Sequence, residues 1–463
     1  MLTRLTSAAR LRALALPLAA CLVLPVAAGP ALAVEVGAAP VPAPAPAPAP
    51  APGIAPAPPA APGNPGPGGV SADAADAADS AGADGGESSD PAAIPTRSAA
   101  PNTDNCPNAL VPPQARTTSE ALAPGQAAPT PPPVTYQGPC GVSAAPGFQV
   151  PAELTASSWL IFDIDSGQIV AAKDPHGRYR PASVIKVLLA MVVLRDLNID
   201  AVVPISEEAA GIEGSAVGVG TTGRYTTRDL LYGLLLASGN DAATALSQAL
   251  GGTDVALAKV NELAQQLGAT DTHVGAVTGL DSAGQMTSVT DLARFYRAAW
   301  RNPLFAQIVN TEHVDFPGYD DHPGYQVWND NGLFMNDPDG IGGKTGYTDD
   351  ANHTFVGGMD RGGRRLAAVI LDTTIDKGRP WEQAQRLLNA AYALPPAAQI
   401  GSLDTPPPAP DATSEAPEAP GPAEAHTSSA LSDAHGTLIG GIVAAVVIIA
   451  AIGAGVWSLR RRR

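Results

Sequence analysis

The residues best placed by type and spacing to do chemistry are Ser183 and Lys186, which lie three positions apart at the start of a predicted helix. At this spacing both side chains share one face of the helix, so the lysine can reach the serine hydroxyl. A serine is a weak nucleophile until a base removes its proton, and a desolvated lysine can act as that base. The positive end of the helix also stabilises the charge that develops on an attacked carbonyl. The pair therefore predicts a nucleophile and its base, although Ser-x-x-Lys alone is easily met by chance.

A second motif, Ser238-Gly239-Asn240, lies between two predicted helices, where its side chains can point into a cleft. A second hydroxyl at that position could relay a proton, and the amide could hold a substrate amide. The same three residues are also common in a plain turn between helices, so this motif alone does not decide between the two interpretations.

A third motif, Lys344-Thr345-Gly346, follows the glycine-rich run 340–343 and precedes Tyr347. A cation beside a hydroxyl suits a carboxylate ligand. Gly346, which lacks a side chain, allows another backbone to approach closely. The alternative is a glycine-rich turn that carries an exposed lysine.

Together the three motifs are far more specific than any one of them. Ser-x-x-Lys, Ser-Asp-Asn and Lys-Thr-Gly form the joint set of class A β-lactamases and penicillin-binding proteins. Here all three occur in that order in one segment, with Gly in place of Asp in the second. About residues 155–398 resemble the low-molecular-mass penicillin-binding proteins, which are serine D-Ala-D-Ala carboxypeptidases of the peptidase S11 family, and the flanks resemble those of actinobacterial members. The stretches that carry this resemblance are 180–186, 236–243, 329–333 and 343–348.

The resemblance implies a role for each motif residue. Ser183 would be the acylated nucleophile and Lys186 its general base, while Ser238 and Asn240 would relay protons and hold the peptide. The third motif would bind the terminal D-alanine carboxylate, with the contributing residues being Lys344, Thr345, Gly346 and Tyr347. The backbone N–H groups of Ser183 and Tyr347 would form an oxyanion hole. Peptidoglycan stem peptides ending in D-Ala-D-Ala would be the substrate, β-lactam antibiotics would be inhibitors, and no cofactor or metal is expected.

The order of predicted elements is typical of an α/β (α+β) domain. Two strand-like runs, 159–163 and 168–173, flank the hairpin signal Asp165-Ser166-Gly167. Helical periodicity and capping residues then predict helices over 183–197, 226–236, 256–267 and 290–300, and one starting near Asn240. Strands over 353–359 and 365–372 and a helix over 381–393 follow. Strands at both ends with helices between them predict one antiparallel sheet packed on a helical cluster, which agrees with the penicilloyl-serine transferase fold that the resemblance implies.

The chain ends carry export and membrane signals. A positively charged start, an apolar run and Ala31-Leu32-Ala33 predict a signal peptide over 1–33, with a lipidated Cys21 as the alternative. An uncharged apolar run predicts a transmembrane helix over 437–459, and the arginines of 460–463 place the C-terminus in the cytoplasm. The protein would then be a single-pass cell-membrane protein whose catalytic domain is extracellular, on the cell-wall side.

Proline-rich composition predicts linkers over 34–150 and 401–436 around a catalytic domain at 151–400. In an exported chain cut after Ala33, Cys106 and Cys140 remain, and an even pair favours a disulfide over two free thiols. The β-rich domain that many family members carry after the catalytic domain is expected to be absent, because the second linker begins near Leu403.

Other function classes fit less well. A β-lactamase would need an extra glutamate between the second and third motifs; Glu262 lies there, but in an amphipathic helix. A non-catalytic β-lactam sensor or wall-binding scaffold is the further alternative, although the intact motifs argue against it. The net charge of −17 argues against nucleic-acid binding, which requires clustered basic residues. Asp320-Asp321-His322 matches no zinc spacing and lies in a loop marked by Pro and Gly.

Overall fold

The computed structural model describes residues 96–405. The predicted signal peptide (1–33), the alternative lipidation site Cys21, the transmembrane helix (437–459) and the tail (460–463) lie outside these residues, as does most of both predicted linkers. Among the helices within 96–405, none combines the length and apolar character needed to cross a bilayer.

An antiparallel sheet forms one half of the described chain, with strand order β1-β3-β2-β10-β9-β8 and with β11 added to β3. Its bounds are β1 Val142–Ala144, β2 Ser158–Asp163, β3 Gln168–Lys173, β8 Gly340–Thr348, β9 Asn352–Arg361, β10 Arg364–Thr373 and β11 Gly401–Ser402. Side chains of a strand alternate between the two faces of its sheet. In β2, Trp159 and Ile161 therefore face one apolar cluster, and Leu160 and Phe162 face another.

Helices cover both faces of this sheet. α9 (Pro380–Tyr392) packs on β9 and β10, with α8 (Gly332–Asn336) beside it, and α6 (Val289–Trp300) packs on β2 and β10. The remaining helices form a cluster next to β8, comprising α1 Lys186–Asp196, α2 Glu207–Ala210, α3 Thr227–Leu236, α4 Asn240–Ala249, α5 Thr253–Gln266 and α7 Pro303–Val309. Two small two-stranded antiparallel sheets complete the cluster, namely β4 Val202–Val203 with β5 Tyr225–Thr226, and β6 His313–Phe316 with β7 Tyr325–Trp328.

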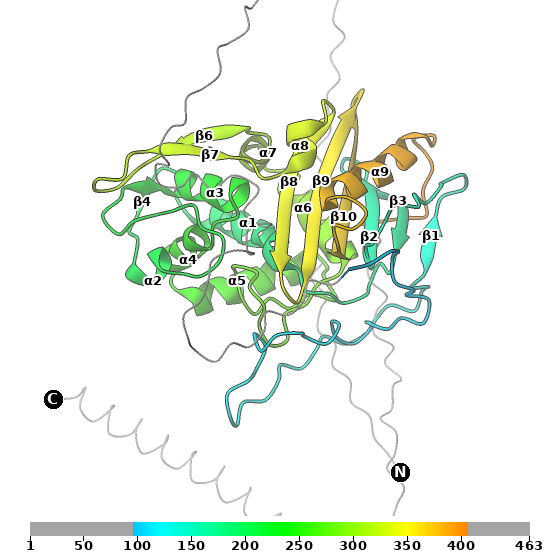
Figure 1. Cartoon of the computed structure of the whole chain (residues 1–463), viewed down its shortest axis with the longest axis horizontal. Coiled ribbons are helices and arrows are strands. Elements are labelled where there is room, and N and C mark those ends of the chain that lie inside the picture. Colours follow the sequence, from blue (N-terminus) through cyan, green and yellow to red (C-terminus); the bar gives the residue numbers. More distant parts are fainter. Residues whose placement is uncertain (1–95, 406–463) are drawn as a thin grey trace, which may run out of the picture. The chain divides into compact units, whose positions relative to one another are not determined.

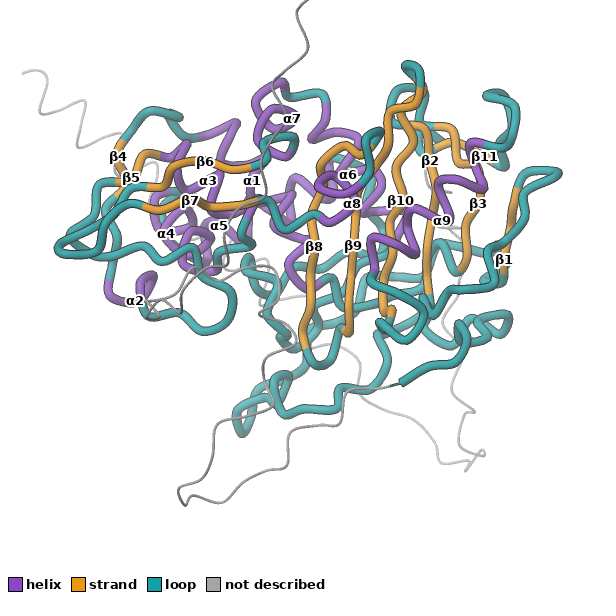
Figure 2. Tube along the Cα trace, turned by 45° about the horizontal axis from the view of Figure 1, so that its top comes forward, coloured by secondary structure: helices purple, strands orange, loops and turns teal. Residues whose placement is uncertain are grey.

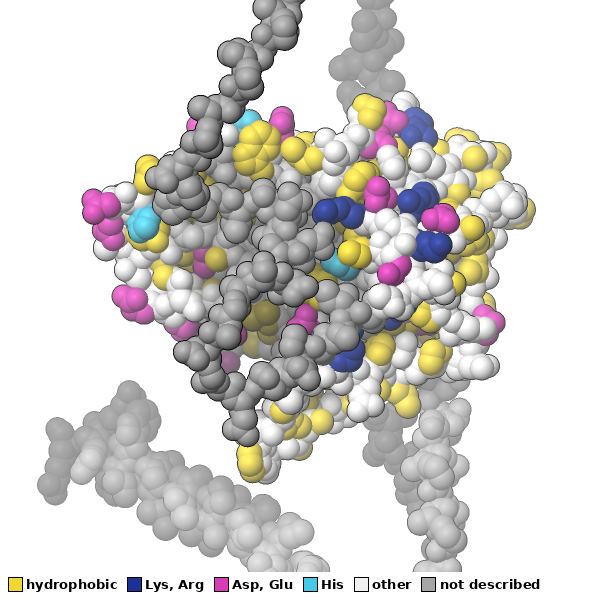
Figure 3. Space-filling model, in the orientation of Figure 1, with side chains coloured by type: hydrophobic (Ala, Val, Ile, Leu, Met, Phe, Trp, Pro, Cys, Tyr) yellow, Lys and Arg dark blue, Asp and Glu magenta, His cyan; other side chains and the backbone are white. Residues whose placement is uncertain are grey.

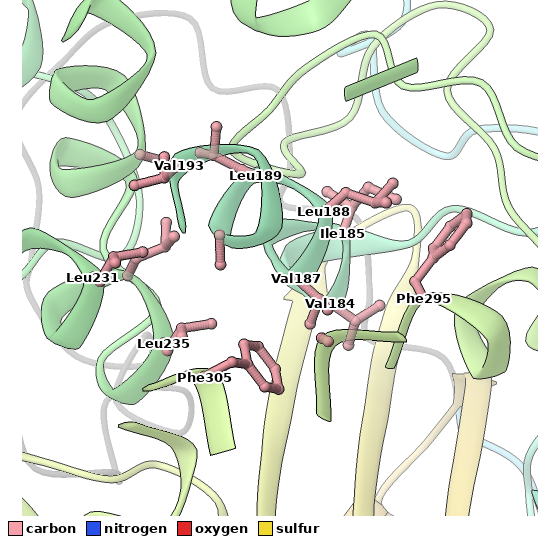
Figure 4. Packing of buried hydrophobic residues seen from close by; sticks show 14 of the residues in the cluster. Val184, Ile185, Val187, Leu188, Leu189, Val193, Leu231, Leu235, Phe295 and Phe305 are labelled. Carbon is pink, nitrogen blue, oxygen red and sulfur yellow. The ribbon is translucent and has the colours of Figure 1, made fainter. Parts of the chain in front are cut away.

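Helix α1 is the central helix of the cluster and directly follows a 3₁₀ turn over Ala182–Ile185. Figure 4 shows its apolar side chains surrounded by Leu231 and Leu235 of α3, Phe295 of α6 and Phe305 of α7. A helix that is apolar around most of its circumference is typical of a core position. Because such cores are close-packed, the residues on the first turn of α1 are held in fixed positions.

The predicted α+β class and penicillin-binding-type fold are confirmed, as are the predicted hairpin (β2–β3) and the helices. The predicted helix start at Thr226 is also correct, since Thr226 and Asp229 form a reciprocal capping box. The predicted helix over 183–197 differs at its start, where a 3₁₀ turn replaces the first α-helical turn. This tighter turn carries Ser183.

The predicted linker boundary at residue 150 is wrong for the described part. Residues 96–141, which we call the strap, run along the lower edge of the domain in Figure 1 and bond to it at several points, and Cys106 and Cys140 form a disulfide. The strap has almost no regular secondary structure, so its backbone carbonyls remain available to accept hydrogen bonds. Two of them, of Leu110 and Pro133, accept from the buried Arg178. Composition alone did not reveal these anchors.

The predicted domain end at residue 400 is also too early. β11 pairs with β3, Leu403 is buried, and Asp404 forms an ion pair with Arg297. The folded domain therefore includes the first residues of the predicted second linker.

Candidate active site

Ser183 lies at the junction between the helical cluster and the sheet, because the 3₁₀ turn that carries it packs on β8 and β9. The close approach depends on glycine. A Cβ added to Gly346 of β8 would lie 2.8 Å from the Ser183 backbone nitrogen, closer than real side chains come. Ala182, just before the serine, has a φ of +47°, a strained conformation for a residue other than glycine. The nucleophile turn is therefore held in an unusual backbone shape against the strand that bears the third motif.

Lys186 is fully buried, and its amine has three hydrogen-bond partners. Its Nζ lies 2.7 Å from Ser183 Oγ, 2.7 Å from Asn240 Oδ1 and 2.6 Å from the Thr278 carbonyl oxygen. The predicted spacing of three residues therefore does bring the lysine to the serine, and the structure adds two partners from distant parts of the chain.

The hydrogen-bond acceptors around Lys186 bear on the protonation state that catalysis would require. The Thr278 carbonyl can only accept, and Asn240 presents its oxygen because its Nδ2 donates to the Glu213 carbonyl at 2.7 Å. A neutral amine has two N–H groups for these acceptors and one lone pair, which then faces Ser183. Burial, aided by the charge of Lys344, lowers the pKa of Lys186 well below its usual range. The lowered pKa makes the neutral form of Lys186, which can accept the serine proton, more accessible than it is for an exposed lysine.

The second motif forms the junction of α3 and α4. Ser238 has a φ of +60° and is only 6% exposed, and its hydroxyl has no hydrogen-bond partner among residues 96–405. Both ends of the Asn240 amide bond within the protein, to Lys186 and to the Glu213 carbonyl. These contacts hold Asn240 against the lysine amine, and the peptide contacts predicted for Ser238 and Asn240 stay predictions.

The third motif lies on β8, at an edge of the sheet beside Ser183. Lys344 is 0% exposed, and its Nζ donates to the Thr345 carbonyl at 3.0 Å and lies 3.5 Å from Asp330 Oδ2. Burial lowers the pKa of Lys344, while the nearby Asp330 opposes that shift. The Thr345 hydroxyl donates to the same Asp330 oxygen at 2.6 Å. The cation therefore lies behind the strand surface, and Thr345, Gly346 and Tyr347 are more exposed than it is.

Three contributors to the site were not among the predicted site residues: Asp330, Thr278 and Glu213. Asp330 lies in the stretch 329–333 that carried the family resemblance, which is the signal that could have identified it. Thr278 and Glu213 contribute backbone carbonyls, and a backbone carbonyl leaves no mark in the residue types. Only the packing of their loops against Lys186 and Asn240 reveals them.

The residues weighed for other chemistry lie elsewhere. Glu262 is exposed on α5, where it accepts a hydrogen bond from Gln266. Asp320 accepts from Thr222 in a surface loop, and the His322 ring packs on Tyr319. Within 96–405, no group of three or more metal-binding side chains is assembled. On the face shown in Figure 3, basic side chains are interspersed with acidic ones.

Comparison with known proteins identifies the family. The sequence profile of the peptidase S11 family, described as D-alanyl-D-alanine carboxypeptidase, matches residues 144–374. D-alanyl-D-alanine carboxypeptidase DacB2 of Mycobacterium tuberculosis is 44% identical over 252 residues, which are 54% of this chain and 86% of that protein. This chain belongs to the S11 family of D-alanyl-D-alanine carboxypeptidases. It is therefore a serine hydrolase of the penicillin-binding type.

Two further relatives support the fold and its extent. The crystal structure of a D-alanyl-D-alanine carboxypeptidase from Mycobacterium tuberculosis H37Rv matches with a TM-score of 0.54 and 42% identity, over 56% of this S11 chain and 99% of that one. D-alanyl-D-alanine carboxypeptidase DacD of Escherichia coli is 33% identical over 51% of this chain but only 63% of its own length. The strap (96–141) precedes the segment that the family profile matches.

Proposed function

We propose that this S11 enzyme removes the terminal D-alanine from peptidoglycan stem peptides through an acyl-enzyme on Ser183. The single observation that carries the proposal is the arrangement around Lys186, whose two carbonyl-type acceptors leave the lone pair for the Ser183 hydroxyl 2.7 Å away. A buried base paired in this way with a serine is what nucleophilic catalysis requires.

The acylation step follows from these positions. Ser183 Oγ attacks the carbonyl carbon of the D-Ala-D-Ala bond while its proton passes to Lys186. The backbone N–H groups of Ser183 and Tyr347 stabilise the oxyanion. When the tetrahedral intermediate collapses, the C–N bond breaks and the departing amine takes a proton that returns from Lys186, with Ser238 as the relay.

Deacylation reverses the same proton transfers with water in place of the amine. Water attacks the ester carbonyl, Lys186 accepts a proton from it, and the Ser183 oxygen leaves with that proton. The products are the shortened peptide and free Ser183, and D-alanine has already departed in the first half of the reaction. No metal or cofactor is needed for either half.

Recognition of the free carboxylate is assigned to the third motif. The Thr345 hydroxyl and the edge of β8 are more exposed than Lys344, which is buried beside them. In a partly desolvated cleft the positive field of Lys344 attracts the carboxylate, and the Thr345 hydroxyl can donate to the carboxylate once it turns away from Asp330. Lys344 thus does two things, because the same charge also lowers the pKa of Lys186.

The decisive experiment is mass spectrometry of the full-length protein after incubation with benzylpenicillin and, separately, with a D-Ala-D-Ala peptide. We expect a stable penicilloyl adduct on Ser183, release of D-alanine from the peptide, and neither event in Ser183→Ala. An adduct on another residue, or D-alanine release by Ser183→Ala, would refute the assignment. Rapid turnover of penicillin instead of a lasting adduct would indicate a β-lactamase.

We also propose that the enzyme is anchored in the cell membrane by residues 437–459, with the catalytic domain on the cell-wall side. This proposal rests on the uncharged apolar run and on the arginines at 460–463. Protease added to intact cells should cut within 406–436 and release an active, penicillin-binding fragment. An active domain that is found only inside the cell would contradict this topology.

A further inference from the structure

We propose that the strap positions the two backbone segments that bear the oxyanion donors, and that Glu120 acts through Arg180 as a positioning residue for acylation. The inference rests on the proposed function, because it concerns the rate at which Ser183 is acylated. It assigns a role to residues that precede the segment matched by the family profile.

The backbone segment that leads into Ser183 is bonded to the strap through Arg180. Its guanidinium is nearly buried and bonds to both carboxylate oxygens of Glu120, at 2.5 and 2.9 Å, and to the Pro113 carbonyl at 2.7 Å. A bidentate arginine–carboxylate pair fixes geometry as well as charge. Arg180 is three residues before Ser183, so the pair holds the chain that leads into the nucleophile turn.

The second segment, the end of β8 that carries Tyr347, is bonded to the same strap through Asp350, in the turn between β8 and β9. Its carboxylate accepts from the backbone N–H groups of Arg116 and Thr117 and from the hydroxyls of Thr117 and Ser119. Arg116 also donates from its side chain to Asn352 Oδ1 at 2.9 Å. Asp350 is three residues after Tyr347, which would supply the second oxyanion N–H.

Residues 113–120 thus bridge the two segments whose separation sets the oxyanion hole. Donors must lie within a few tenths of an ångström of their working positions for electrostatic stabilisation of a transition state. The two segments also meet directly, where Gly346 lies against the Ser183 nitrogen and where the Thr354 hydroxyl of β9 donates to the Pro181 carbonyl at 2.9 Å. Because residues 113–120 contact both segments, they resist the separation of the two oxyanion donors while Ser183 attacks the carbonyl carbon.

The strap itself is anchored independently of the site. The Cys106–Cys140 disulfide closes a loop within the strap that includes residues 113–120, and Arg178 donates to the carbonyls of Leu110 and Pro133 at 3.0 Å each. Tyr136 stacks on His176 with ring centroids 4.3 Å apart. Loss of the Glu120–Arg180 ion pair should therefore loosen the contact between the strap and the Ser183 segment without releasing the strap from the domain.

The test compares Glu120→Gln with a matched control, Asp404→Asn. Arg297, like Arg180, is a nearly buried arginine that bonds to backbone carbonyls (of Ile164 and Asp165) and to one carboxylate, that of Asp404. The contacts of this control pair lie at the β2–β3 turn. Both variants of the full-length protein are assayed for penicillin acylation by rapid-quench mass spectrometry, with thermal unfolding measured in parallel.

Glu120→Gln should acylate about 10- to 100-fold more slowly at saturating penicillin, since a misplacement of about 1 Å can cost about 10²-fold in rate. Its half-saturating penicillin concentration should change little, and Asp404→Asn should stay within about twofold of wild type. Equal acylation by Glu120→Gln and wild type, or an equal loss in both variants, would overturn the inference. A wild type that forms no adduct on Ser183 would refute the proposed function instead.

A milder variant covers the case in which Glu120→Gln does not fold. Thr117→Val combined with Ser119→Ala removes only the two hydroxyl donors to Asp350 and leaves the backbone donors in place. We expect at least about a threefold slower acylation rate with an unchanged half-saturating concentration. A wild-type rate in this double variant would show that the strap does not position the site.

Discussion

Replacing Asn240 by aspartate should prevent Lys186 from acting as a base, because it should keep the Lys186 amine protonated. In the structure, the Asn240 Oδ1 lies 2.7 Å from Lys186 Nζ, and both residues are buried. Aspartate has nearly the same shape but carries a negative charge at this distance. A carboxylate favours the ammonium form of the lysine, so the pKa of Lys186, which burial lowers in the wild type, should rise.

The size of the effect follows from the distance. At 2.7 Å and an effective dielectric constant of about 20, two unit charges attract by about 6 kcal/mol. Desolvation of the new carboxylate opposes this attraction, and we take about half of it, about 3 kcal/mol, as the net effect. At about 1.4 kcal/mol per factor of ten, the pKa of Lys186 should rise by about two units, so the neutral fraction of Lys186 near pH 7, and with it the acylation rate, should fall by at most about 100-fold.

The assay is the rate of Ser183 acylation by benzylpenicillin from pH 6 to 10. The rate in Asn240→Asp should be low at pH 7 and rise with pH toward the alkaline end, because raising the pKa moves the neutral form of Lys186 to higher pH. Asn261→Asp is the matched control. Within the described residues, the Asn261 side chain bonds to backbone groups of Leu257 and Val274 and not to a lysine. A wild-type pH profile in Asn240→Asp would refute the argument that a neutral Lys186 is the base.

Three further outcomes are expected. Lys186→Arg should acylate at less than about 1% of the wild-type rate while remaining folded, because a guanidinium does not give up its proton; near-normal acylation would mean that another group activates Ser183. Gly346→Ala should slow acylation by about 100-fold without a matching change in penicillin affinity, because its Cβ would lie 2.8 Å from the Ser183 nitrogen; unchanged rates would show that the strand can shift freely. At an alkaline pH where Lys186 is neutral in both proteins, Lys344→Ala should lower kcat/KM for free-acid D-Ala-D-Ala peptides by about 30-fold or more, but change little for C-terminally amidated peptides; an equal loss for both would make Lys344 structural. Since the charge of Lys344 lowers the pKa of Lys186, the acylation profile of this variant should also move to higher pH.

Several features of the site could be predicted from local sequence because chain geometry alone determines them. The spacing of Ser183 and Lys186 brings their side chains together within one turn, whatever surrounds that turn. The β2–β3 hairpin and the capping box at Thr226 are local in the same sense. The order of strands and helices was sufficient to predict one antiparallel sheet on a helical cluster.

The strap shows where composition misleads. Its proline content predicted a semi-extended linker that could pack on the domain only near Cys106 and Cys140, because such sequence cannot bury much apolar surface. In the structure it is held by polar contacts to buried arginines and to Asp350, across separations of 45 to 234 residues. Hydrogen bonds to backbone carbonyls do not depend on side-chain type, so no compositional signal predicts them.

By itself, the sequence determined the three motifs and their order, and it predicted Ser183 as the nucleophile and Lys186 as the base, since these depend on residue type and on distances along the chain. Tertiary structure alone decides the surroundings that lower the pKa of Lys186 and the alignment of that pair. The Asn240 and Thr278 acceptors lie 54 and 92 residues from Lys186, and only the packing of α4 and the 278 loop against α1 brings them to its amine. The pKa of a buried group depends on everything that surrounds it, and that surrounding exists only once the chain has folded.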